Sequence, residues 1–357
     1  MKKLLALILS AVMVLSLTAC GDSGSATQPT DTAGSSTTGS GTAGTESGEA
    51  AASYDKTTII VGDIYNENTT QGQALNAFKE YVESTSNGDV TVDIYHGGSL
   101  GSEGEHAQAQ LEGSIDLIFS GTAGVGLFVP ATAVFEAWYA FDSIDAIVAT
   151  YESVQSTLDS AFSNEGFKLL GCYYDGPRQI LSNKPITNID DLKGLKLRAP
   201  GSAIYVNSIS AIGANAISMA LGDVYTSLQT GAIEAMEGTM DLIIAQKFYE
   251  QGKYLIKDSH VYQPLFITYN LNNWNRLNAD TQQLILDGVA RSEEVQLELY
   301  REALEGYEKT LQDAGLEFLT LTDRDKWVEA VAQVSGDYAA EYGDLGMAIL
   351  KAMQEQQ

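Results

Sequence analysis

The sequence has few cysteines, few histidines and few basic residues. Its 357 residues include two cysteines, three histidines, and 20 lysines and arginines against 47 aspartates and glutamates. The histidines at positions 96, 106 and 260 are scattered and give no metal-ligand spacing, so we expect no metal and no other cofactor. The formal net charge of −27 argues against nucleic acid as a partner, because the phosphate backbone would be repelled.

Motifs of known catalytic sites are also missing. The sequence contains no P-loop and no Cys–His cluster, so a binding protein is favoured over an enzyme. One enzyme alternative is a secreted protein that acts on an acidic or sugar substrate through the paired carboxylates of Glu234 and Glu237. The residues around this pair are typical of strand and turn rather than helix, which argues against a shared catalytic face.

The first fifty residues are expected to lie outside the folded part of the chain. The stretch MKKLLALILSAVMVLSLTAC places two lysines before an apolar run that is shorter than the ~20 residues a transmembrane helix needs. We predict an export signal over residues 1–19. The ending LTAC resembles a bacterial lipobox, so Cys20 is expected to be lipidated and to anchor the chain to the membrane. Residues 20–53, rich in Ser, Thr and Gly, predict a flexible tether.

Strand-like and helix-like segments alternate from residue 57 onward. Runs rich in β-branched residues predict strands at residues 57–65, 89–97, 115–121, 167–175, 194–200, 215–220, 233–238, 261–271 and 316–322. Helical spacing predicts helices at residues 70–84, 105–112, 145–164, 202–212, 221–230, from 279 onward and from 323 onward. This order predicts an α/β fold with a largely parallel sheet. Cys172, Trp138 and Trp274 are expected in its core.

We expect two α/β lobes, with the long helix that starts at Ala279 packed across both and a ligand cleft between them. The first lobe is predicted to comprise residues 54–175 plus about 264–303. The second is predicted to comprise residues 176–263 plus about 304–357. Because the lobes must move freely, we expect a monomer.

Two arginines twenty residues apart are the strongest candidates for a binding site. Arg178 follows a predicted strand, and Arg198 lies in the strand GLKLRAP. A guanidinium presents a planar fork of donors that fits a carboxylate with two parallel hydrogen bonds. The alternative for each arginine is a salt bridge to one of the many acidic residues.

Three stretches resemble the DctP-type solute-binding proteins of TRAP transporters, the tripartite ATP-independent periplasmic group. They are ITNIDDLKGLKLRAP, GSLGSEGEHAQAQLEGSIDL and ALGDVYTSLQTGAIEAMEG, and the resemblance spans about residues 57–335. It implies a two-lobed periplasmic-binding-protein-like fold, type II-like, on the outer face of the cytoplasmic membrane or in the periplasm. It also implies that Arg198 binds the carboxylate of a small organic acid, that Arg178 assists, and that a TRAP membrane permease is the partner.

The sequence departs from the family pattern at several positions. Gly238 stands where the family has an asparagine that brackets the carboxylate, and Leu221 stands where an aromatic residue is common, so a wider pocket is expected. Glu103 matches a family glutamate that is expected to cap or orient its helix, with a solvated surface acid as the alternative. By analogy with the family, the cleft is also expected to be lined by Tyr65, Ser120, Thr122 and Tyr173.

Two further functions stay open at this point. The segment DLKGLKLR is also similar to one in binding proteins of ATP-driven importers, although the run GDVYTSLQTG and the long helix favour the TRAP group. A sensor partner that reads the same ligand is not separated from a transport protein by any residue of the sequence.

Overall fold

A computed structural model describes residues 52–356, apart from the side chain of Glu305. The predicted export signal, Cys20 and nearly all of the predicted tether lie outside the described residues, so these remain predictions. In the described range, no helix is long and apolar enough to cross a membrane.

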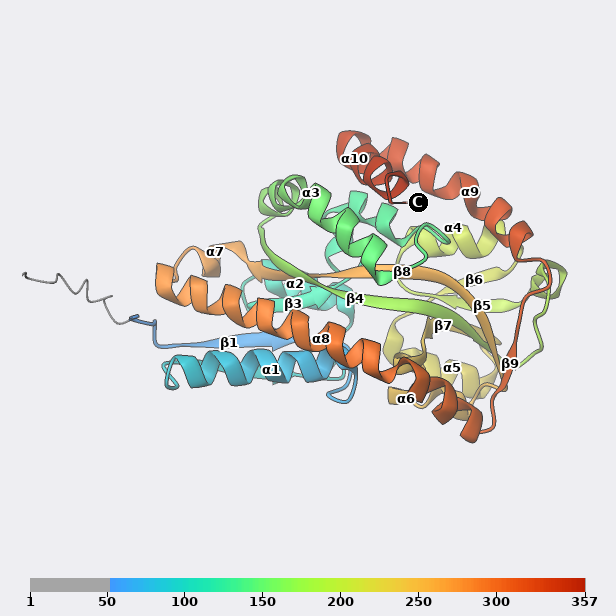
Figure 1. The fold of residues 1–357 in the computed structure, drawn as a ribbon, viewed down its shortest axis with the longest axis horizontal. Helices are drawn as coiled ribbons and strands as arrows, with labels where there is room; N and C mark the ends of the chain where they lie inside the picture. Colours follow the sequence, from blue (N-terminus) through green and yellow to red (C-terminus); the bar gives the residue numbers. More distant parts are fainter. Residues whose placement is uncertain (1–51, 357) are drawn as a thin grey trace, which may run out of the picture. The chain divides into compact units, whose positions relative to one another are not determined.

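One mixed sheet organises this part of the chain, with nine strands in the order β2-β1-β3-β8-β4-β7-β5-β6 and β9 beside β8 (Figure 1). The strands are β1 (Thr57–Gly62), β2 (Val90–Tyr95), β3 (Leu117–Ser120), β4 (Phe167–Ser182), β5 (Lys196–Ala199), β6 (Asn215–Ser218), β7 (Ala235–Thr239), β8 (Tyr254–Asn270) and β9 (Glu317–Leu319). Strands β1, β2 and β3 are parallel to one another, as are β5, β6 and β7.

The expected largely parallel sheet is therefore wrong at its centre. The long strands β4 and β8 pair antiparallel with each other, and they also run antiparallel to their outer neighbours β7 and β3. Both strands extend well beyond the predicted segments and join the two parallel groups. A hydrophobic run shows that a strand exists, but its direction depends on where the chain re-enters the sheet, which a local pattern does not contain.

The helices follow the predicted segments closely and add three short ones. They are α1 (Thr70–Thr85), α2 (Glu103–Leu111), α3 (Ile144–Asn164), α4 (Ala203–Ala211), α5 (Val224–Thr230), α6 (Met240–Ala245), α7 (Leu271–Trp274), α8 (Ala279–Asp313), α9 (Arg324–Glu341) and α10 (Gly343–Gln354). Short 3₁₀ helices are η1 (Val125–Leu127), η2 (Pro130–Glu136), η3 (Ile189–Leu192), η4 (Leu221–Asp223) and η5 (Phe248–Glu250).

Local residues explain several helix boundaries. Side chains of Thr69, Ser143 and Asn278 accept hydrogen bonds from the first turns of α1, α3 and α8. Gly231, at φ 72°, ends α5 in the left-handed conformation that glycine adopts without steric cost. Helices α6 and α7 were not predicted, because six and four residues carry too little periodicity, and α10 follows α9 after a single residue, so both fall in the one helix predicted from residue 323 onward.

Two buried clusters form the core, one on each face of the sheet. One cluster gathers α3, η2, α4, α9 and α10, and the other gathers α1, α5, α6 and α8. Cys172 is completely buried, and Trp138 and Trp274 are 5% and 6% exposed, which confirms their predicted place in the core. Helix α8 contacts α1, α6 and β4 along its length, as Figure 1 shows.

A buried carboxyl on α8 makes stability depend on pH. Glu293 accepts a hydrogen bond of 2.6 Å from the backbone N–H of Cys172 and has no cation beside it in the described structure. Burial raises the pKa of Glu293 from 4.5 to about 7, and this hydrogen bond offsets only part of that effect.

We expect Glu293→Gln to be more stable than the parent at pH 8 by roughly 1–3 kcal/mol and nearly equal to it at pH 4. Between pH 4.5 and 7 the folded parent holds a proton that the unfolded chain has lost, so the parent loses stability as the pH rises through this window. Denaturant unfolding at both pH values measures the difference. A constant difference at the two pH values would contradict it.

Candidate functional site

A cavity of about 580 Å³ lies beside the carboxyl ends of the strands. The lining residues of one wall fall within the segments 64–65, 97–105 and 121–136, and those of the other wall fall within the segments 178–205, 218–223 and 242–263. Both predicted lobes thus contribute to the lining. A volume of this size suits a small-molecule ligand.

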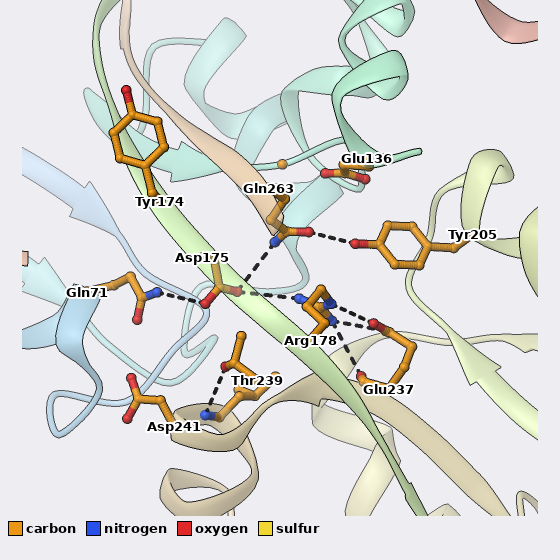
Figure 2. A network of polar contacts seen from close by, with 12 residues as sticks. Gln71, Glu136, Tyr174, Asp175, Arg178, Tyr205, Glu237, Thr239, Asp241 and Gln263 are labelled. Carbon is orange, nitrogen blue, oxygen red and sulfur yellow. Dashed lines mark hydrogen bonds and ion pairs between the residues drawn. The ribbon is translucent and has the colours of Figure 1, made fainter. Parts of the chain in front are cut away.

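Arg178, on β4, is held in place by one carboxylate from the neighbouring strand β7 and one from its own strand. Its Nε donates to Glu237 Oε2 at 2.5 Å and its Nη2 donates to Glu237 Oε1 at 3.0 Å, which makes a bidentate pair. Its Nη1 lies 3.4 Å from Asp175 Oδ2. Figure 2 shows Asp175 at the centre of a network in which Gln71 and Gln263 also donate to its carboxylate. Arg178 is 4% exposed, so this arrangement is largely shielded from water.

Arg198, on β5, is held by fewer charged partners. Its Nε and Nη2 donate to the carbonyl oxygen of Met219 at 3.3 and 3.2 Å, and its Nη1 lies 3.4 Å from Glu237 Oε1. A guanidinium has five N–H groups. One N–H on Nη1 and one on Nη2 therefore have no partner among the described residues, while the side chain lines the cavity.

Glu237 links both arginines and is completely buried. Burial favours its neutral form, but the charge of Arg178 and a hydrogen bond from His260 outweigh this effect and hold the pKa of Glu237 well below its usual value. His260 Nε2 lies 3.5 Å from Glu237 Oε2, and His260 Nδ1 lies 2.8 Å from Asp258 Oδ2. Glu237 is thus a carboxylate that orients the two arginines.

Two carboxyls stand on the other wall of the cavity. Glu103 accepts a hydrogen bond of 2.9 Å from the backbone N–H of Gly121, and Glu136 accepts from the backbone N–H and the hydroxyl of Thr122. Burial raises the pKa of Glu103 and of Glu136 to about 7, against the lowering effect of these hydrogen bonds. Each of these two carboxyl groups therefore gains or loses its proton near neutral pH.

The structure brings together five of the eight residues that the sequence nominated. Those that line the cavity are Arg178, Arg198, Tyr65, Thr122 and Leu221. The other three, Ser120, Tyr173 and Gly238, are not part of the lining. The hydroxyl of Ser120 accepts a hydrogen bond from the backbone N–H of Val125 at 3.0 Å, and the hydroxyl of Tyr173 donates one to Ser292 on α8 at 2.9 Å. Both hydroxyls therefore make hydrogen bonds inside the protein core.

Gly238 lies on β7 behind Arg178. A Cβ atom there would come within 3.2 Å of Leu242 and Met236 and within 3.8 Å of the Arg178 Nη2. An asparagine at this position would thus require the neighbouring side chains to shift. Neighbouring side chains fill the space beside Gly238, so the glycine does not widen the cavity there.

Glu103 lies in the first turn of α2 and lines the cavity, so the alternative of a solvated surface acid is wrong, while the expected role in orienting the helix is consistent with its contact. Ser102 and Glu105 form the capping box at the start of α2, whereas Glu103 connects α2 to the loop after β3 through Gly121. The catalytic pair considered in the sequence, Glu234 and Glu237, is not formed, because the two carboxylates have different partners. Glu234 forms a salt bridge with Lys184 at 2.6 Å and does not line the cavity, and Glu237 is sequestered by the arginines.

Several functional residues escaped the sequence reasoning. Glu136 falls in an aromatic-rich stretch without periodicity, and Tyr205 falls on the apolar face of a predicted helix. Tyr205 donates to Gln263 Oε1 at 2.7 Å, and its ring lies 5.6 Å from the guanidinium carbon of Arg178. Tyr205 and Gln263 both line the cavity. No local signal marks such residues, because their partners lie 14 to 58 positions away in the sequence.

A two-sided α/β fold with an arginine fork open to a central cavity defines a protein that binds a solute. Residues 61–341 match the family model of bacterial extracellular solute-binding proteins, family 7, known as DctP. The chain belongs to this family, which confirms the resemblance drawn from the sequence. Within residues 52–356, no group of three or more His, Cys, Asp or Glu side chains is arranged to hold a metal ion.

Relatives and solved structures agree with this assignment. The chain is 30% identical over 302 residues to a solute-binding protein of Sulfitobacter sp., covering 82% of this chain and 90% of the relative. It is 28% identical over 299 residues to the C4-dicarboxylate-binding periplasmic protein DctP of Rhodobacter capsulatus, with the same coverage. The crystal structure of a TRAP periplasmic solute-binding protein from Pseudomonas putida F1 with bound D-glucuronate is 26% identical and has a TM-score of 0.77, covering 82% of this chain and 96% of that one. The predicted two-lobed α/β fold is thereby confirmed.

Proposed function

We propose that this protein captures a small organic anion in the cavity and delivers it to the membrane permease of a TRAP transporter. The observation that carries the proposal is the open edge of Arg198: two of its N–H groups have no partner among the described residues, and its side chain lines a cavity of about 580 Å³. A carboxylate accepts two parallel hydrogen bonds from such an edge. Relatives named for a C4-dicarboxylate and a structure with bound D-glucuronate support an organic carboxylate as the ligand.

In this proposal, Arg198 makes the direct contact and Arg178 contributes its remaining Nη1–H. The wall that carries Glu103 and Thr122 then approaches the bound anion as the lobes close. Closure excludes water and lowers the local dielectric constant, which strengthens the hydrogen bonds to the carboxylate. The lobe boundaries predicted from the sequence remain part of the proposal.

The proposal also includes an anchor on the outer face of the cytoplasmic membrane. Cys20 follows the sequence LTA, and lipidation there would keep the chain close to its permease. We expect the exported protein to start at Cys20 and to carry lipid, and Cys20→Ser to be released from membranes. Mass spectrometry of the mature N-terminus checks this, and an unmodified Cys20 in the exported protein would contradict it.

A thermal-shift screen of the purified protein tests the binding function. The panel consists of hexuronates, aldonates, keto acids, C4-dicarboxylates, amino acids and neutral sugars. Because a ligand that binds only the folded state raises the midpoint, we expect at least one organic anion to raise it by several degrees and neutral sugars to leave it unchanged. A shift with neutral sugars alone would overturn the proposal.

A further inference from the structure

Helix α1 has no acidic residue of its own in its first turn. The hydroxyl of its N-cap residue, Thr69, accepts a hydrogen bond from the backbone N–H of Gly72 at 3.1 Å. The first N–H groups of a helix carry partial positive charge and are stabilised by a nearby carboxylate. A carboxylate from another part of the chain can therefore complete the N-terminus of α1.

Asp241, on α6, supplies this carboxylate. Its Oδ2 accepts hydrogen bonds from the backbone N–H of Thr70 at 2.9 Å and from the Thr70 hydroxyl at 3.2 Å, and Asp241 is 9% exposed. Tyr307, on α8, also hydrogen-bonds to Asp241. Helix α1 belongs to the predicted first lobe, whereas Asp241 and Tyr307 belong to the predicted second lobe. The contact between Thr70 and Asp241 therefore joins the two predicted lobes.

A second contact lies at the other end of α6. The side-chain amide of Asn66, in the loop before α1, donates to the carbonyl oxygen of Ala245, the last residue of α6, at 3.1 Å. Residues 66–70 of the predicted first lobe thus hold α6 at both of its ends. We call the pairs Thr70–Asp241 and Asn66–Ala245 the α6 clasp.

The α6 clasp lies beside the ligand cavity without contributing to its lining. Residues 64 and 65, directly before Asn66, line the cavity, and so do Leu242 on α6 and Gln246 directly after it. None of the four clasp residues is part of the lining. A change in the clasp therefore acts on a bound ligand through the relative positions of the two walls.

We propose that the α6 clasp is a latch that stabilises the closed arrangement of the lobes and slows the release of the ligand. This inference rests on the lobe closure of the proposed function and adds the contact that holds the closed state. Lobe opening exchanges the hydrogen bonds of the clasp for hydrogen bonds to water and removes the carboxylate from the N-terminus of α1. The clasp therefore shifts the equilibrium between the two states toward the closed one.

Replacement of Asp241 by asparagine or alanine tests the latch by ligand kinetics. We expect either variant to raise the dissociation rate constant of the best anion from the thermal-shift screen about tenfold, because a partly buried charge at a helix N-terminus contributes free energy of this order. The association rate constant should not fall, because the open state that admits the ligand becomes more populated. Asn66→Ala removes the uncharged half of the clasp and should raise the dissociation rate constant about threefold. Stopped-flow fluorescence gives both rate constants.

Thr69→Ala is the matched control, because it weakens the same N-terminus of α1 from within one lobe. It should lower the midpoint of thermal unfolding and leave the dissociation rate constant within about twofold of the parent. A general loss of stability would affect this variant and Asp241→Asn alike, whereas a latch affects the release of the ligand in Asp241→Asn alone.

The ligand-free protein gives a second test that needs no identified ligand. Glu80, on α1, and Gln229, on α5, are exposed and lie in different predicted lobes. Glu80→Cys and Gln229→Cys take spin labels in a Cys20→Ser background, while Cys172 is completely buried and stays unlabelled. Pulsed electron–electron double resonance should then show a larger fraction of long distances in Asp241→Asn than in the parent, and no change in the control.

Unchanged ligand dissociation in both Asp241→Asn and Asn66→Ala overturns the latch and leaves the proposed function standing. Equal changes in Thr69→Ala and Asp241→Asn also overturn it, because the effect then comes from the weakened helix. Faster dissociation with unchanged distances supports a latch that forms only around the bound ligand. If no organic anion binds the parent protein, the proposed function fails, and the distances alone decide whether the clasp holds the lobes together.

Discussion

Replacement of Arg198 by alanine is expected to lower the affinity for the carboxylate ligand by a factor of roughly 10² to 10⁴. The open edge of Arg198 offers two charge-assisted hydrogen bonds, each with a net contribution of about 1.5–3 kcal/mol. Glu237 keeps its bidentate pair with Arg178 in this variant, so the chain should still fold. Calorimetry with the best anion from the screen gives the ratio of the two dissociation constants.

Two further variants test whether the planar guanidinium of Arg198, rather than its charge alone, is needed for ligand affinity. Arg198→Lys keeps the charge without the planar pair of donors, and we expect it to recover only part of the lost affinity. Arg291→Ala removes an exposed arginine of α8 that pairs with Glu294, and it should bind like the parent. An Arg198→Ala protein that binds within threefold of the parent would show that this arginine has a structural role alone.

Replacement of Glu237 by glutamine is expected to reduce the free energy of unfolding by about 3–5 kcal/mol. Glu237 is completely buried and contacts both arginines, so its loss leaves two guanidinium groups in a low-dielectric environment with Asp175 as the remaining carboxylate partner. Chemical denaturation at pH 7 measures the change. Glu234→Gln, three residues earlier, removes an exposed pair with Lys184 and should cost at most about 1 kcal/mol.

The pH dependence of this difference has a definite sign. Because the pKa of Glu237 is depressed in the folded protein, its contribution is complete above the ordinary value of 4.5 and is lost progressively as the pH falls below it. The gap between the parent and Glu237→Gln should therefore narrow in acid. A gap that widens below pH 4.5, or an equal cost for Glu234→Gln, would contradict the assigned role of Glu237.

Much of the fold could be predicted from the sequence, because the patterns that indicate strands and helices are local. Alternation and helical spacing located the strands β1 to β3 and β5 to β7 and the helices α1, α3 and α8, and a single glycine marked the end of α5. The direction of β4 and β8 could not be predicted in this way. It depends on the return path of the chain over about ninety residues, and the hydrophobic pattern of a central strand is the same in either direction.

The residues of the candidate site likewise fall into those with a local sequence signal and those without one. Arg178 and Arg198 stood out because arginine is scarce and because Arg178 follows a predicted strand and Arg198 lies in one. Glu136 gave no such signal, since it lies in an aperiodic stretch, and its role follows only from its position across the cavity from the arginines. Tyr173 shows the converse error, because an aromatic residue near the middle of a strand is more often buried in the core than exposed to a ligand.

The irregular pairing of β4 and β8 affects how easily these two strands bend. Their ladder is regular over residues 167–169, 171–175 and 180–182 of β4, and its register shifts between Leu169 and Gly171 and on both sides of Arg178. A backbone with fewer ladder hydrogen bonds resists bending least at that place. Two of the three irregularities thus flank the arginine that pairs with Glu237. If the lobes move as proposed, we expect bending of these strands to shift the guanidinium of Arg178 as well.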